Sequence, residues 1–227
     1  MLEVLQQYGD ALIGLLGVAV GGIIVSFREG LSQRKERRRD GSYSAIRLIC
    51  ILEEYAHKCI DVAGDDGYAY GQPARRTDQG EEYCEAQVTT PEALDFPDDI
   101  AWRSIDEALM HRILALPNKA RSTDRYVYAS AENAFPPEYE EFFEPRQEGY
   151  AKLGLDALNI IDDLRQKHGV SVKSRTDLNT GWNPKEHLQN QIARFEKRDA
   201  ERAKRAASTA SPFPELPKEA TADLEER

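Results

Sequence analysis

The sequence ALIGLLGVAVGGIIVSF occupies residues 11–27, and REGLSQRKERRR follows it directly over residues 28–39. The first stretch carries no charge, and as a helix it would span roughly 25 Å, the lower end of what crosses a bilayer. No Lys or Arg precedes it and no small-residue cleavage site leads into a mature start, so the pattern favours a transmembrane helix over a signal peptide. The alternative is a buried core helix, but such a helix seldom ends in a basic cluster.

The segment after the apolar stretch is basic. Residues 28–40 hold six basic and three acidic side chains. Because positive charge resists translocation, we expect this side to be cytoplasmic, with the short N-terminal tail, residues 1–10, outside the plasma (inner) membrane. The side chains that we expect to contact the headgroups of the lipid bilayer are Arg34, Lys35, Arg37, Arg38 and Arg39.

The apolar stretch contains the pair Gly17 and Gly21 with GxxxG spacing. Small residues at this spacing let two helix backbones approach closely, which predicts a homodimer packed through this face. The alternative is that these glycines have no packing role, since glycine is common in transmembrane helices.

Residues 41–170 are predicted to form an all-α, antiparallel bundle of three main helices. The first covers 43–63, where apolar residues recur at steps of three and four. The sequence leaves open whether this helix continues from the membrane helix. The second covers 104–133, and the third covers 137–168.

The ends of the second and third helices carry specific signals. Ser104 and Glu107 have the capping-box spacing, and Pro117 predicts a kink. Pro137 suits the first position of the third helix, and Gly169 suits its C-terminal stop. Within the third helix, Pro145 leaves open a split into a short first helix and a longer second one.

The connection over residues 65–99 is long and acidic, with ten acidic residues against two basic ones. A loop of this length is typically functional or disordered, and a short hairpin around 83–88 is an open alternative. Residues 171–206 are predicted to form a loop and a charged helix that begins at Asn183-Pro184, and residues 207–227 are predicted to be a disordered tail.

Few residues have the spacing of a chemical site. Glu54 and His57 match one copy of the Glu-x-x-His pattern that di-iron bundles use twice, so we predict no metal and no cofactor. Cys50 and Cys59 are predicted to be buried, and the acids around Cys84 are expected to raise its pKa. No catalytic order of Cys, His and Asp is present.

The run PEYEEFF, residues 137–143, has aromatic residues at helical spacing. Such a cluster is most often part of a core, but an exposed edge would be a surface for docking a partner.

The composition limits the function classes. The chain has 227 residues, a net charge of -10 and a mean hydropathy of -0.62. An acidic chain lacks the cationic surface that nucleic acid requires, so we expect no nucleic-acid partner. Three classes remain: a membrane-anchored binding or scaffold module with a cytoplasmic protein partner, a membrane-acting effector that assembles through its membrane helix, and a metal-dependent bundle enzyme. The lack of a catalytic constellation favours the first.

Overall fold

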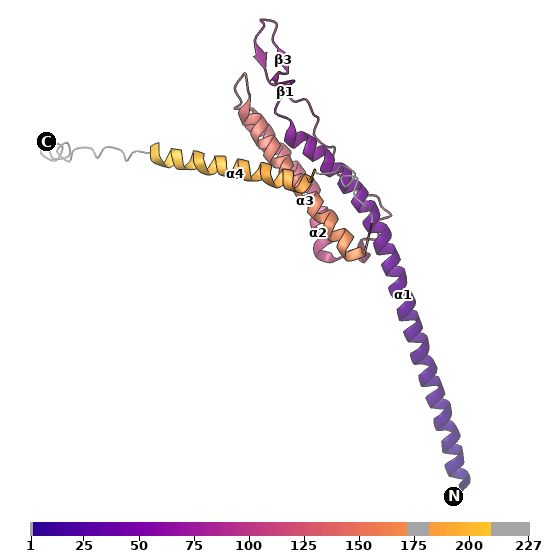
Figure 1. The fold of residues 1–227 in the computed structure, drawn as a ribbon. Helices are drawn as coiled ribbons and strands as arrows, with labels where there is room; N and C mark the ends of the chain where they lie inside the picture. Colours follow the sequence, from indigo (N-terminus) through magenta and orange to yellow (C-terminus); the bar gives the residue numbers. More distant parts are fainter. Residues whose placement is uncertain (1, 172–181, 210–227) are drawn as a thin grey trace, which may run out of the picture.

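The computed structural model describes the backbone of residues 2–171 and 182–209, and side chains from residue 28 to residue 208 within these ranges. This part of the chain is all-α, as predicted, and about 70% helical. Its four α-helices are α1 (Leu2–Gly64), α2 (Glu107–Ala131), α3 (Glu140–His168) and α4 (Pro184–Thr209) (Figure 1).

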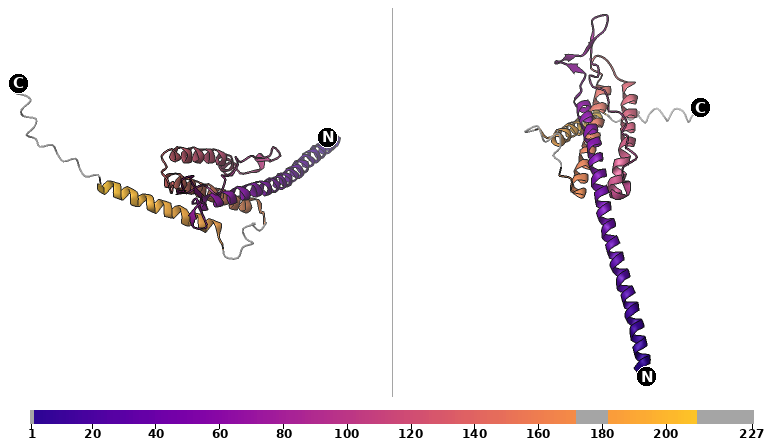
Figure 2. Two further views of the ribbon diagram at one scale, coloured as in Figure 1. Left: turned by 90° about the horizontal axis from the view of Figure 1, so that it is seen from above. Right: turned by 90° about the vertical axis from the view of Figure 1, so that its right-hand side faces the viewer.

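The first helix, α1, is continuous over 63 residues. The predicted helix 43–63 is therefore the last third of a longer helix, and no break separates it from the predicted membrane segment. The N-terminal half of α1 extends well beyond the bundle (Figures 1 and 2). Contact with the bundle begins at Gly41, where a Cβ would lie only 3.0 Å from Nδ1 of His168. A larger residue at position 41 would require the His168 ring to shift.

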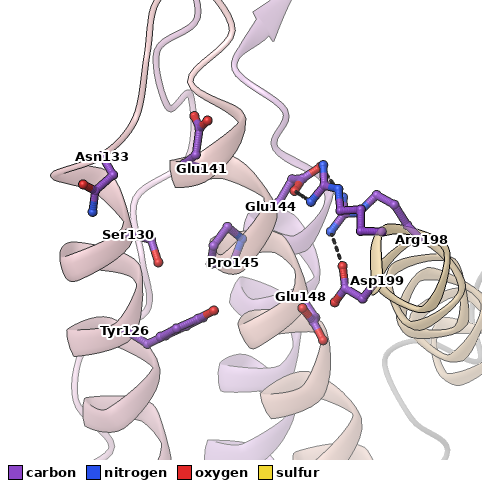
Figure 3. A pocket seen from close by; sticks show the side chains of 10 residues that line it. Tyr126, Ser130, Asn133, Glu141, Glu144, Pro145, Glu148, Arg198 and Asp199 are labelled. Carbon is purple, nitrogen blue, oxygen red and sulfur yellow. Dashed lines mark hydrogen bonds and ion pairs between the residues drawn. The ribbon is translucent and has the colours of Figure 1, made fainter. Parts of the chain in front are cut away.

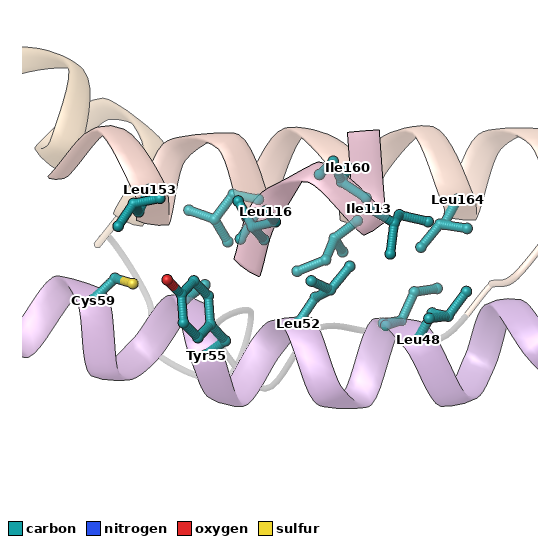
Figure 4. Close-up of a cluster of buried hydrophobic side chains, with 14 of the residues drawn as sticks. Leu48, Leu52, Tyr55, Cys59, Ile113, Leu116, Leu153, Ile160 and Leu164 are labelled. Atoms are coloured by element: carbon teal, nitrogen blue, oxygen red, sulfur yellow. The ribbon is translucent and has the colours of Figure 1, made fainter. Parts of the chain in front are cut away.

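The core lies between α1, α2 and α3. The helix α3 runs antiparallel to both of the others, because its end at His168 lies beside Gly41 of α1, and Lys167 bonds to Asp106 at the start of α2. Leucine, isoleucine, tyrosine and cysteine side chains from the three helices interdigitate (Figure 4). The innermost of them include Leu48, Leu52, Leu109, Ile113, Leu116, Ile160, Ile161 and Leu164.

Both predicted helix starts were a few residues early. Ser104 lies in a short 3-10 helix, Trp102–Ser104, and Asp106 caps α2 instead, accepting the N–H of Leu109 at 3.2 Å. Asp106 lies two residues after Ser104 and is better placed to accept from the first N–H groups of α2. Its hydrogen bonds to Lys167 and to the N–H of Leu109 hold the pKa of the Asp106 carboxyl below its usual value. The third helix begins at Glu140 rather than Pro137, because Tyr139 adopts a left-handed conformation (φ 51°). Gly169 ends it as predicted.

Pro117 and Pro145 lie inside α2 and α3, so neither proline splits its helix.

The acidic connection contains two small antiparallel hairpins. Strand β1 (Tyr68–Ala69) pairs with β2 (Gln72–Pro73), and β3 (Arg75–Arg76) pairs with β4 (Glu82–Tyr83). Both hairpins lie before most of residues 83–88, where the sequence leaves a hairpin open as an alternative. In the second hairpin, the opposite charges of Arg76 and Glu82 pair across the two strands.

The last described helix, α4, leaves the bundle at a steep angle (Figures 1 and 2). Its predicted cap is confirmed, since Oδ1 of Asn183 accepts the N–H of Lys185 at 3.1 Å. Leu188 and Phe195 pack its first half on the bundle. The helix continues to Thr209, so the tail predicted over 207–227 was wrong for its first three residues, and residues 210–227 lie outside the described ones.

Among the described side chains, from residue 28 onward, no helix is long and apolar enough to cross a membrane. The predicted span 11–27 precedes these side chains, and its backbone is helical as part of α1.

Candidate functional site: an acidic cleft at the end of the bundle

The predicted lipid-contacting residues lie on the part of α1 that precedes the bundle. All five are exposed, and none makes an ion pair within the described part of the chain; they are Arg34, Lys35, Arg37, Arg38 and Arg39. Lys35, Arg38 and Arg39 line one groove with Tyr43 and Ile46. At 3.6 residues per turn, the three acids of this segment share a different face; they are Glu29, Glu36 and Asp40. Gly17 and Gly21 lie in the helical backbone of α1, outside the described side chains.

The Glu54 and His57 pair does not form the start of a metal centre. Nδ1 of His57 lies 2.8 Å from the carbonyl oxygen of Glu53, so one ring nitrogen is already engaged within its own helix. Over the described ranges, no three His, Cys, Asp or Glu side chains converge to hold a metal ion.

The three cysteines have different surroundings. Cys59 is buried as predicted, and burial raises the pKa of its thiol to about 12. Cys50 is exposed, so its predicted burial was wrong. The face of α1 that packs on α3 is the neighbouring one, which carries Leu48, Ile49 and Leu52, and Cys50 lies outside it. The pKa of Cys84 is raised as predicted, but burial is the main cause and the neighbouring carboxylates add less.

One buried ion pair fixes the acidic connection to the bundle. Asp65 and Arg146 are each about 2% exposed in their side chains and pair at 2.9 Å. The carboxylate of Asp65 also accepts the N–H groups of Gly67, Gln87 and Val88 at 2.9–3.1 Å. Arg146 donates in turn to the carbonyl of Val88. The pair therefore joins the end of α1, the connection and α3, and neither residue was singled out from the sequence.

A cleft of about 320 Å³ opens between the end of α2, the start of α3 and the middle of α4 (Figure 3). It lies at the end of the bundle remote from the N-terminus (Figure 1). Tyr126 points from α2 toward α3, and Ser130 and Asn133 complete the α2 side. The α3 side carries three carboxylates one turn apart; they are Glu141, Glu144 and Glu148.

Two arginines of α4 already bind one of these carboxylates. Arg198 pairs with Glu144, and Arg202 pairs with the same carboxylate at 2.8 Å. The guanidinium of Arg198 also stacks on the ring of Phe195, 4.9 Å from its centroid. The first turns of α3 therefore bind guanidinium groups presented by another helix.

Other carboxylates at this end have no cationic partner within the described residues. Glu141 accepts only the N–H of Phe135, at 3.4 Å, and Glu132 and Glu138 are exposed without ion pairs there. Three large aromatic side chains in the same stretch are exposed: Tyr126 is 64% exposed, Tyr128 73% and Phe135 71%, and of these Tyr126 lines the cleft. The cleft and its rim, residues 126–148, therefore combine negative charge with exposed rings.

The run at 137–143 lies at this rim. Phe143 is buried, Phe142 packs edge-on against it at 5.0 Å, and Tyr139 is half-buried. The aromatic run is thus mostly core, while its glutamates face outward. A signal for the cleft was present in the sequence, because residues 126–145 contain five glutamates and no Lys or Arg.

No known protein family, no characterised protein and no solved structure matches this chain.

Proposed function

We propose that this chain is a membrane-anchored helical binding module that presents its bundle to a cytoplasmic protein partner. The observation that carries the proposal is the continuity of α1. One unbroken helix contains the uncharged residues 11–27, the basic residues 28–39 and the first core residues of the bundle. A helix with this order is typical of a single membrane span followed by a cytoplasmic domain.

The length of α1 adds a geometric consequence. Residues 28–40 extend the helix by about 20 Å between the end of the apolar stretch and the bundle. Electrostatic attraction to anionic lipid falls off within about 8–10 Å at physiological salt. Arg34 and Lys35 therefore reach the headgroups more readily than Arg37, Arg38 and Arg39, when α1 stands upright.

The exposed bundle surface supports a binding role. The cleft described above is an open surface feature lined with charged side chains and the ring of Tyr126, whereas the described residues offer no converging set of metal ligands. Self-association through Gly17 and Gly21 is part of the same proposal, as a homodimer that would present two bundles side by side.

Extraction of membranes with alkaline carbonate tests the anchor. Wild-type chain should remain in the membrane pellet. The double variant Val18→Lys, Val20→Lys should move to the supernatant, because each charge at the centre of a span costs about 2.5–3.5 kcal/mol. The matched control is Leu31→Lys, an exposed position outside the stretch, which should stay in the pellet. Release of wild-type chain by carbonate would contradict the anchor.

A further inference from the structure

We infer that the cleft between α2, α3 and α4 binds a Lys- or Arg-rich segment of the partner protein. The inference rests on the proposed function in naming a cytoplasmic protein as the partner. It goes further by assigning the surface and the chemistry of what that surface recognises.

Charge supplies the first argument. Residues 126–145 carry five glutamates without a basic residue, and the described part of the chain leaves three of these without an ion pair: Glu132, Glu138 and Glu141. Of the three, Glu141 lines the cleft itself. A surface with uncompensated carboxylates attracts cationic partners and repels anionic ones. Nucleic acid and anionic lipid are therefore poor occupants of this cleft.

The exposed rings supply the second argument. A Lys or Arg group over a Tyr or Phe face gains cation–π attraction in addition to its ion pairs. Tyr126 lies on the wall opposite Glu141 and Glu148 (Figure 3). Glu148 already pairs with Lys152, so a cation that enters the cleft meets a ring on one side and the carboxylate of Glu141 on the other.

An ion-pair contact within the chain provides a model for the inferred binding. Arg198 and Arg202 of α4 dock on Glu144 at one end of the cleft. A partner's arginine would occupy the remaining part, between Tyr126 and Glu141, next to these two. A second copy of the chain offers basic side chains at residues 28–39, on the free part of α1 at the opposite end of the molecule, and on α4, whose arginines already occupy one end of this cleft (Figure 1). The experiment below therefore treats a second copy as a separate outcome.

The test uses the purified full chain in nanodiscs of neutral phosphatidylcholine and a fluorescein-labelled peptide of four Arg-Gly repeats. Fluorescence anisotropy should show saturable binding that weakens as NaCl rises. The double variant Tyr126→Ala, Glu141→Gln should bind roughly tenfold more weakly. Both side chains are exposed, so thermal unfolding should be unchanged and serves as the check on folding.

The matched control is Tyr70→Ala, Glu81→Gln, which removes the same chemical groups from the exposed hairpin region. It should change the affinity less than twofold. Equal losses in both variants would overturn the inference in favour of general acidity, and so would the absence of saturable binding up to millimolar peptide. Dimerisation of the wild type that the Glu141 variant abolishes would identify a second copy as the occupant and also overturn it. If carbonate releases the chain from membranes, the same anisotropy measurement is made on the full chain without nanodiscs, so the anchor and the cleft fail separately.

Discussion

At the scale of single residues, the most demanding feature is the ion pair of Asp65 and Arg146. Two charges taken out of water are tolerated only when their hydrogen bonds are satisfied, and here backbone N–H groups and the Val88 carbonyl satisfy them. The pair lies where the end of α1, the acidic connection and α3 meet, a place where an apolar contact would be the more usual link. It explains how a connection of more than thirty residues is held against the bundle.

Replacing Arg146 with Met should destabilise the fold by about 3–5 kcal/mol, because the Asp65 carboxylate would remain buried without its cation. Urea unfolding followed by circular dichroism measures this. The control, Arg47→Met, breaks the exposed pair with Asp99 and should leave the midpoint unchanged. Similar midpoints for wild type and the Arg146 variant would show that the buried pair is not formed.

The thiols provide a second residue-scale prediction. Cys50 is exposed, while Cys59 and Cys84 are buried with raised thiol pKa values. The thiolate is the reactive form, and a pKa of about 12 leaves the Cys59 thiol protonated at pH 8. Ellman's reagent at pH 8 should therefore modify one thiol of the native chain rapidly and all three after denaturation. Rapid native modification of two or three would be inconsistent with this packing.

At the scale of elements, the first hairpin depends on glycines in the left-handed region. Gly67 (φ 78°) lies against Phe143, where a Cβ would come within 2.3 Å of the ring, whereas Gly71 (φ 79°) has open space around it. The two positions share one backbone conformation and differ in their surroundings. Substitutions at these two positions therefore distinguish the cost of a left-handed backbone from the cost of a steric clash with neighbouring side chains.

Gly71→Ala should cost about 1–2 kcal/mol, the ordinary penalty for a left-handed side chain. Gly67→Ala should cost about 1–3 kcal/mol more, because Phe143 belongs to the packed start of α3 and must shift. Thermal or urea unfolding of the two variants side by side measures the difference. Equal losses would mean that Phe143 does not contact the turn.

At the scale of the whole molecule, the proposed anchor predicts that α1 sets the distance between the bundle and a bilayer. If α1 continues straight from the apolar stretch, Cys50 lies about 35 Å beyond residue 27, out of reach of lipid headgroups. A fluorophore on Cys50 should then be insensitive to headgroup-attached quenchers. The same fluorophore on Arg28→Cys, with Cys50 replaced by Ser, should be quenched strongly. Quenching of the Cys50 label would show that α1 bends and the bundle lies on the membrane.

The segregation of charge also belongs to this scale. The net charge of -10 is the sum of a basic segment at 28–40 and acidic surfaces around the connection and the cleft. The predicted headgroup contacts of Arg37, Arg38 and Arg39 depend on the tilt of α1, since an upright helix holds them beyond the Debye length. In the proposed arrangement, the cleft at the far end would face the cytoplasm in either orientation.

The sequence by itself determined the helical class, the positions of the second and third helices to within a few residues, the Asn183 cap and the Gly169 stop. These features depend on local periodicity and on side chains next to the helix ends, which are properties of neighbouring residues. It also determined the uncharged stretch and the basic segment after it. The misplaced starts show the limit. Near Ser104 two polar residues compete to cap the same helix, and Asp106 is the one that does so. After Pro137 the left-handed conformation of Tyr139 delays the start, and no local pattern indicates it.

Only the tertiary structure decided the rest. Asp65 and Arg146 are 81 positions apart in the sequence, and the cleft takes its walls from α2, α3 and α4. Cys50 and Cys59 share one helical pattern, yet one is exposed and the other buried, because burial depends on which neighbour covers each face. Contacts between distant segments leave no local periodicity, so the arrangement of charges and rings at the cleft became visible only once the helices were packed.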